Sequence, residues 1–269
     1  KPGQDLLLQG ITGLAKNTGR FSYPPTQLGA GIADQLGSLN MVIGILSALH
    51  YRNRTGRGQE IKVDLMSALL QHQLQEFVAV LNLNQEFERP ESGVGHPGSG
   101  APFGIYKTKD DYITIAVASL EDLSEILNDE GLKKYSEGPS GAMGSDLQIK
   151  KRDEIFHYIE NLTKNFTTEF LDKKLSEKGC WSAPLKTHKQ VYDDPQVKHM
   201  NMFTTFHHKN YGEVKTVSPA VKLSETPTKV TRPVPMIGEH GFEILKEFGY
   251  SDEEINNFIT NDIMSIEKS

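Results

Sequence analysis

The longest apolar run of the chain lies near its N-terminus, between Leu36 and Leu49. The apolar residues of this run lie on nearly all sides of a helix instead of one face, and this pattern predicts a buried helix. Asp34 precedes the run where a helix N-cap is expected, and Gly56 and Gly58 follow it, as glycines often do at helix C-termini. We therefore predict a buried helix between Asp34 and Gly56.

Shorter patterns flank this helix. Small and apolar residues at 5–15 predict a helix or a closely packed segment. At 61–65 apolar residues alternate with charged ones, which predicts a strand or a short extended stretch, and positions 67–83 have helical periodicity. This first part of the chain is therefore expected to be mostly helical.

Glycine and proline are frequent at 92–104, which indicates a flexible hinge or loop. Beyond it, strands are predicted at 106–108, 112–118, 203–207 and 214–217, the last two as a hairpin. Helices are predicted at 121–127, 150–165, 167–178, 193–197, 241–248 and after Ser251, and residues 182–184 are predicted to form a tight connection.

The overall composition suits a soluble globular protein, with 37% hydrophobic and 24% charged residues in 269. The net charge of −6 argues against a nucleic-acid partner. We count no apolar stretch of the roughly 20 residues that cross a bilayer, so no membrane partner is expected. Because Lys1 is not an initiator Met, we expect that the chain begins inside a longer protein or was processed.

Cysteine and histidine usage narrows the chemistry further. The single cysteine, Cys180, excludes an intrachain disulfide framework and fits a reducing compartment, so a cytoplasmic location is expected. His199, His207 and His208 lack metal-ligand spacing with other donors, and we predict no metal site.

Asp34 is the leading candidate for covalent or acid–base chemistry. The small residues at 29–33 leave room for a ligand to approach the backbone, and a helix N-terminus stabilises a carboxylate. A basic, glycine-punctuated turn at 50–59 follows the helix and could bind an anion. A helix cap is the simpler interpretation of Asp34; its surroundings also fit a nucleophile or a base.

The same stretch resembles the class III CoA-transferases of the CaiB/BaiF type, the family of formyl-CoA transferase, carnitine CoA-transferase and α-methylacyl-CoA racemase. Their segment reads Asp, small residues, an apolar helix and Arg-x-Arg-Thr-Gly-x-Gly-Gln, as residues 34–59 do here. Further segments resemble the family in the family's order, at 1–13, 95–104, 179–184, 194–196 and 238–249. The family normally begins with a long nucleotide-fold segment, and nothing in this chain resembles it.

The resemblance implies an α/β fold with a large CoA-binding domain, here incomplete at its N-terminus, and a smaller α+β domain. Residues 1–90 would form the C-terminal part of the large domain, 91–200 the small domain with its connecting loop, and 201–269 the return to the large domain. Family members form interlocked dimers, so a homodimer is expected.

The resemblance also implies an enzyme that transfers CoA between an acyl-CoA thioester and a carboxylic acid. Asp34 matches the family's acyl-accepting aspartate, which attacks the thioester to give a mixed anhydride and then carries CoA as an aspartyl thioester. The acyl-CoA and the acid are the expected partners, and this chemistry uses no bound cofactor and no metal.

Residues expected to bind CoA or substrate are Lys1, Gln4, Gly93, Gly95, His96, Arg54 and Arg57. By resemblance, Lys1 lies near the adenine-phosphate end of CoA, and the glycine loop closes over the acyl intermediate and excludes water. Arg54 and Arg57 either meet the CoA phosphates or complement the helix C-terminus, where positive charge is favourable.

Gln4 separates two activities within the resembled family. The racemase branch has a histidine at this position, paired with the aspartate for proton transfer, and a primary amide has no useful basicity. We therefore favour CoA transfer. The alternatives are a 2-methylacyl-CoA racemase or epimerase and, in a different class, a non-catalytic CoA-binding subunit.

Overall fold

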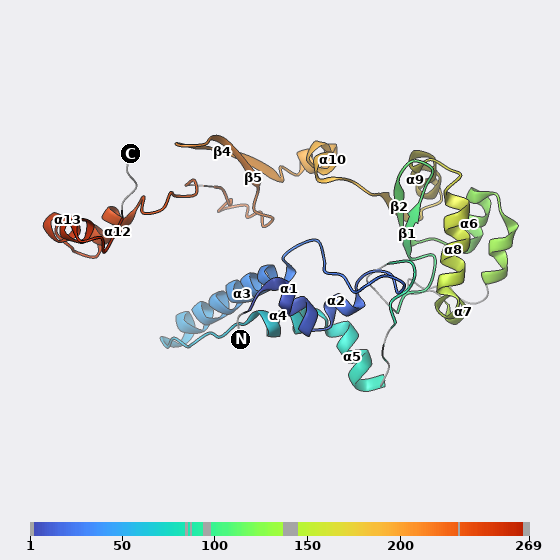
Figure 1. Ribbon diagram of the computed structural model, residues 1–269, viewed down its shortest axis with the longest axis horizontal. Helices are drawn as coiled ribbons and strands as arrows, with labels where there is room; N and C mark the ends of the chain where they lie inside the picture. The colour runs from blue at the N-terminus through green and yellow to red at the C-terminus, as the bar shows by residue number, and fades with distance from the viewer. Residues whose placement is uncertain are drawn as a thin grey trace. The chain divides into compact units, whose positions relative to one another are not determined.

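The computed structural model describes residues 3–83, 86, 88–93, 98–136, 145–230 and 232–265, and the chain divides into two compact units, Lys1–Leu185 and Lys186–Ser269 (Figure 1). Helices are combined with small antiparallel sheets, which confirms the α/β class. The finer division at residues 90 and 200 stays a prediction, as does the homodimer.

The first part of unit one is helical, as predicted. Its helices are α1 (Asp5–Ile11), α2 (Leu14–Asn17), α3 (Ile32–Thr55), α4 (Leu65–His72) and α5 (Leu74–Leu83). α1, α3 and α4 contact one another around a small core of Leu8, Ala33 and Leu69 (Figure 1). The single helix predicted at 67–83 is broken at Gln73 into α4 and α5.

α3 is the predicted apolar helix, and its start differs from the prediction. Gly31 is the N-cap and makes no side-chain cap, while Asp34 lies inside the first turn, so the prediction of Asp34 as the cap is wrong. The predicted end is confirmed, because the helix stops at Thr55 and Gly56 adopts the left-handed φ of 73° that favours glycine.

The predicted burial of α3 is wrong for this chain. Its buried residues are the small Ala33, Gly37 and Ala48. The large side chains of Ile43 and Leu46 are each 61% exposed. The chain therefore covers one side of this helix and leaves apolar side chains open on the others.

Two glycines let α3 approach its neighbours closely. A Cβ at Gly37 would lie 2.6 Å from Leu65 Cδ2, and one at Gly44 would lie 2.8 Å from Ile61 Cγ2. By length and composition the 24-residue helix could cross a membrane, contrary to the expectation that no stretch is long enough. A core helix of a soluble protein meets the same criteria of length and composition. The contacts at Gly37 and Gly44 show that one side of α3 packs against other parts of the chain.

Of the strand and the short extended stretch predicted as alternatives at 61–65, the strand is not formed. Residues 57–64 form no ladder with any described strand and lead directly into α4. Ile61 instead packs against Gly44 of α3, and Asp64 caps α4 by accepting a hydrogen bond from the Ser67 N–H. The alternation of apolar and charged residues here therefore reflects packing of Ile61 against helix α3 and not a strand.

The second part of unit one is an antiparallel sheet with helices. The strands β1 (Gly104–Lys107), β2 (Tyr112–Val117) and β3 (Trp181–Pro184) lie in the order β1-β2-β3. The described helices are α6 (Leu120–Leu127), η1 (Glu130–Tyr135), α7 (Asp146–Lys150), α8 (Arg152–Thr163) and α9 (Thr168–Glu177). The predicted strands and helices are confirmed, but residues 182–184 form an edge strand paired with β2, not a tight connection.

Unit two contains short elements, and all of them except α10 follow the predicted order. They are α10 (His188–Asp193), α11 (Pro195–His199), β4 (Phe203–His208), β5 (Gly212–Val217), α12 (Gly241–Glu247) and α13 (Asp252–Thr260). The predicted hairpin is confirmed, with Phe203 opposite Val217 and His208 opposite Gly212.

Candidate functional site

Asp34 lies in the first turn of the 24-residue helix α3, and its side chain is exposed. The unpaired N–H groups of a helix N-terminus favour a negative charge at this place. A Cβ at Gly31 would lie 3.8 Å from Asp34 Oδ2, so the residue before the helix leaves the carboxylate accessible. In the part of the chain that the structure describes, no donor reaches this carboxylate.

A cavity of about 560 Å³ opens beside Asp34. It is lined by Asp34, Gly37, Ser38, Met41, Val63, Asp64 and Leu65. The second carboxylate of the cavity is already engaged, because the Ser67 N–H and hydroxyl donate to Asp64 at 2.8 and 2.7 Å. These bonds, the backbone one foremost, hold the pKa of Asp64 below its ordinary value. Asp34 is therefore the carboxylate of this cavity that is available to react.

Two buried polar residues on α1 support the turn before Asp34. Asp5 Oδ1 accepts a hydrogen bond from the Ala33 N–H at 2.7 Å, and its Oδ2 accepts one from Gln9 Nε2 at 2.6 Å. Gln9 Oε1 accepts the Leu28 N–H at 2.9 Å. The sequence patterns do not predict this network; its one signal in the sequence is a pair of polar residues, Asp5 and Gln9, four positions apart on an apolar helix.

The predicted binding residues are not all brought to Asp34. Gln4 is the N-cap of α1 and accepts the Leu6 N–H at 3.0 Å. Arg54 is in the last turn of α3, so it is roughly 30 Å from Asp34 at 1.5 Å per residue. Arg57 follows that end of the helix.

The remaining candidates belong to the N-terminus and the glycine loop. Lys1, Gly95 and His96 lie outside the described residues. Gly93 has a left-handed φ of 71°, and a Cβ there would lie 3.1 Å from Arg20 Cγ. The left-handed backbone thus favours glycine at Gly93, whether or not the loop closes over a substrate.

The segment that leads into the glycine loop is firmly anchored. Arg89 donates to the carbonyl oxygens of Thr18 and Tyr23 at 3.0 and 2.9 Å. The carboxylate of Glu91 accepts hydrogen bonds from the Ser22 N–H and hydroxyl at 2.8 and 2.9 Å. These contacts fix one end of the loop.

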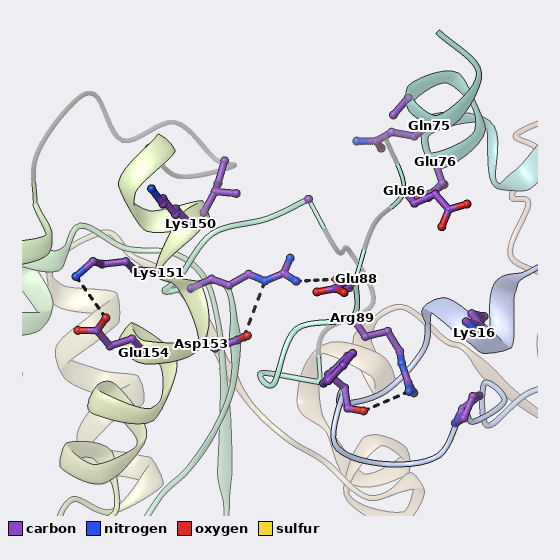
Figure 2. A pocket seen from close by; sticks show the side chains of 16 residues that line it. Lys16, Gln75, Glu76, Glu86, Glu88, Arg89, Lys150, Lys151, Asp153 and Glu154 are labelled. Carbon is purple, nitrogen blue, oxygen red and sulfur yellow. Dashed lines mark hydrogen bonds and ion pairs between the residues drawn. The ribbon is translucent and has the colours of Figure 1, made fainter. Parts of the chain in front are cut away.

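A larger cavity of about 1330 Å³ lies elsewhere in unit one (Figure 2). Lys16, Gln75, Glu76, Glu86, Glu88, Arg89, Lys150, Lys151, Asp153 and Glu154 are among the residues that line it. Charges of both signs alternate around it, and Lys151 pairs with Glu154 at 3.4 Å. It has no dominant charge and does not include Asp34, so we place the candidate site at the smaller cavity.

Comparison with known proteins gives one consistent family. Residues 1–241 match the sequence model of CoA-transferase family III. The formyl-CoA:oxalate CoA-transferase of Streptomyces coelicolor is 29% identical over 93% of this chain and 64% of its own length. The human succinyl-CoA:glutarate CoA-transferase is 27% identical over 97% of this chain and 59% of its own length.

A solved structure agrees with the sequence matches. A CaiB/BaiF family protein from Brucella suis superposes with a TM-score of 0.73 and 27% identity, covering 92% of this chain and 63% of that protein. The chain therefore spans less than two thirds of the length of each of these relatives.

Proposed function

The chain belongs to CoA-transferase family III, and on that premise we propose that the protein transfers CoA between an acyl-CoA thioester and a carboxylic acid, with Asp34 as the nucleophile. The observation that carries the proposal is the geometry of Asp34. It is an accessible carboxylate at a helix N-terminus, beside a cavity and without a hydrogen-bond donor among the described residues.

The proposed first half-reaction consists of two nucleophilic substitutions, each at a carbonyl carbon. A carboxylate oxygen of Asp34 attacks the thioester carbonyl, the C–S bond breaks, and CoA thiolate leaves a mixed anhydride. The thiolate then attacks the aspartyl carbonyl of the anhydride, and the donor acid leaves as a carboxylate. Asp34 is now a CoA thioester, and no proton has been gained or lost overall.

The second half-reaction reverses these steps with the acceptor acid. Its carboxylate attacks the aspartyl thioester and releases CoA thiolate, which attacks the acceptor's acyl carbon. The acceptor leaves as its CoA thioester and Asp34 is regenerated. Residues 29–33 include four small residues, Gly29, Ala30, Gly31 and Ala33, which leave space for these carbonyl groups.

Gln4 favours transfer over racemisation. Its amide caps α1 through the Leu6 N–H, and an amide cannot serve as the second base that α-proton exchange requires. We propose acyl-CoA and carboxylate as the substrate classes, without a specific pair, and we propose a cytoplasmic location. Binding of CoA by Lys1, Arg54 and Arg57, and closure of the loop at Gly93, Gly95 and His96, stay predictions.

We also propose that the protein acts as a homodimer. The apolar residues Ile43 and Leu46 of α3 and Leu81 of α5 are exposed, and burying such side chains stabilises an interface by about 1.5–3 kcal/mol each. A second chain that covers them would remove this apolar surface from water.

The test of the function is trapping of the intermediate on Asp34. With an active acyl-CoA and acid pair, hydroxylamine added during turnover converts an aspartyl anhydride or thioester into a hydroxamate, which peptide mass spectrometry locates. We expect the hydroxamate at Asp34 and a loss of transfer of at least about a thousandfold in Asp34→Ala.

Asp64→Ser is the matched control, because Asp64 lines the same cavity and serine still caps α4. This variant should retain transfer and the Asp34 hydroxamate. Activity of Asp34→Ala near the wild-type rate would refute the proposal, and exchange of the substrate α-proton in deuterated water would favour the racemase.

A further inference from the structure

The start of α3 lacks a cap of its own. The first N–H groups of a helix have no partner within the helix and need an acceptor. The N-cap here is Gly31, which has no side chain to accept one. The Ala33 N–H instead donates a hydrogen bond to Asp5 Oδ1 at 2.7 Å. This acceptor lies 28 positions earlier in the chain.

The acceptor is itself held on both sides. Gln9 Nε2 donates to the second oxygen of Asp5 at 2.6 Å. Gln9 Oε1 accepts the Leu28 N–H at 2.9 Å, and Gln9 Nε2 also lies 3.5 Å from the Ala30 carbonyl oxygen. One pair of side chains on α1 therefore fixes three points of the turn that ends at Asp34.

The network is buried, and its burial favours one backbone arrangement. Asp5 is 8% exposed, and Gln9 and Ala33 are fully buried. A buried carboxylate without donors is costly, so Asp5 favours the backbone arrangement that gives it the Ala33 N–H. Ala33 directly precedes Asp34 in the first turn, so the same arrangement sets the direction of the Asp34 carboxylate.

We propose that Asp5, held by Gln9, is a positioning residue for the Asp34 nucleophile, an inference that rests on the proposed function. Asp5 acts on Asp34 through the backbone of Ala33, whose N–H donates to Asp5 Oδ1. Attack on a thioester requires correct placement, and a misplacement of about 1 Å can cost about a hundredfold in rate.

The test exchanges donor and acceptor within the network. In Asp5→Asn, an oxygen can still accept the Ala33 N–H, but the amide nitrogen then faces Gln9 Nε2, donor against donor. In the double variant Asp5→Asn/Gln9→Glu, the bond between the two side chains is reformed in the opposite direction and one buried carboxylate is kept, while the 3.5 Å contact with the Ala30 carbonyl oxygen is lost. We expect a fall in kcat of about tenfold to a hundredfold in Asp5→Asn, with KM within about threefold, and recovery of most of it in the double variant.

Gln73→Met controls for simple loss of stability. Gln73 is 4% exposed and donates to the carbonyl oxygens of Thr12 and Leu69, both at 3.3 Å, in the same helical layer. Neither of these hydrogen bonds of Gln73 involves residues 28–33. If Gln73→Met lowers Tm and kcat as much as Asp5→Asn does, Asp5 is structural only and the proposal is overturned.

Hydrogen exchange at 28–34 provides a readout that does not depend on catalysis. Asp5→Asn should speed amide exchange in this peptide, and the double variant should slow it again; unchanged exchange would overturn the proposal. If the wild type yields no hydroxamate at Asp34, the proposed function fails, while the exchange result still decides whether Asp5 holds the turn.

Discussion

The two parts of unit one bury their apolar side chains to very different extents. Among described residues, the helical part at 3–83 has a core cluster of three buried hydrophobic residues, whereas the sheet and helices at 98–185 have fourteen. Yet the helical part contains α3, which has the longest apolar run of the chain. The element with the longest apolar run thus buries only three small residues, Ala33, Gly37 and Ala48, against its own chain.

The reason lies in how apolar positions are distributed. α8 and α9 are amphipathic, so one apolar side facing the sheet suffices to bury Phe156 and Leu171. α3 is apolar on nearly all sides, and α1 and α4 cover one of them. The candidate nucleophile is on the open element, and the part with a closed core is the one that carries no candidate nucleophile.

The largest stability effect is expected from Phe156→Ala. Phe156 is 1% exposed, and its ring centroid is 4.8 Å from that of Tyr106. Removing it leaves a cavity in the closed core and should lower the free energy of unfolding by about 3–5 kcal/mol, measured by denaturant unfolding. Phe21→Ala in the helical part is the control, since Phe21 is 58% exposed and should cost less than about 0.5 kcal/mol. Equal losses would remove the contrast between the two parts.

A smaller effect on folding, but a clear one on association, is expected from Ile43→Ser/Leu46→Ser. Both side chains are exposed on α3, so their loss should leave the unfolding of a single chain nearly unchanged. If they lie in the proposed dimer interface, light scattering after size exclusion should show a shift from dimer to monomer. Ile237→Ser is the control, because Ile237 is an exposed apolar residue in unit two. A dimer that survives the double substitution would place the interface elsewhere.

The smallest effect is expected at acid pH in the closed part. The Thr168 N–H and hydroxyl donate to Asp110, and these bonds, the backbone one first, lower the pKa of Asp110 from 3.8. Because the folded pKa is depressed, the stabilisation is present above pH 3.8 and is lost as the pH falls through the lower folded value. Asp110→Asn should flatten the fall of Tm between about pH 5 and 2. An unchanged slope would show that Asp110 does not contribute.

Local sequence patterns predicted most helices and strands correctly. They failed for short segments whose structure depends on a neighbouring strand. The hairpins and the helices α6, α8 and α9 follow from periodicity and turn residues that are close in sequence. Residues 182–184 belong to β3 because β2 is available to pair with them. Residues 61–65 form no strand because no described strand pairs with them. A short segment of four or five residues carries too little pattern to reveal its neighbour.

The residues alone were enough to predict the family resemblance, the α/β class, the extent of α3 to within a turn at its start, and Asp34 as the candidate nucleophile. These depend on residue types at fixed spacings along one stretch of chain. Three features are visible only in the folded chain: Gly31 and not Asp34 is the N-cap of α3, Asp5 accepts a hydrogen bond from the Ala33 N–H 28 residues away, and most of α3 is exposed. Hydrogen bonds and burial between distant segments depend on which surfaces meet in space, and no local pattern in a single sequence encodes that.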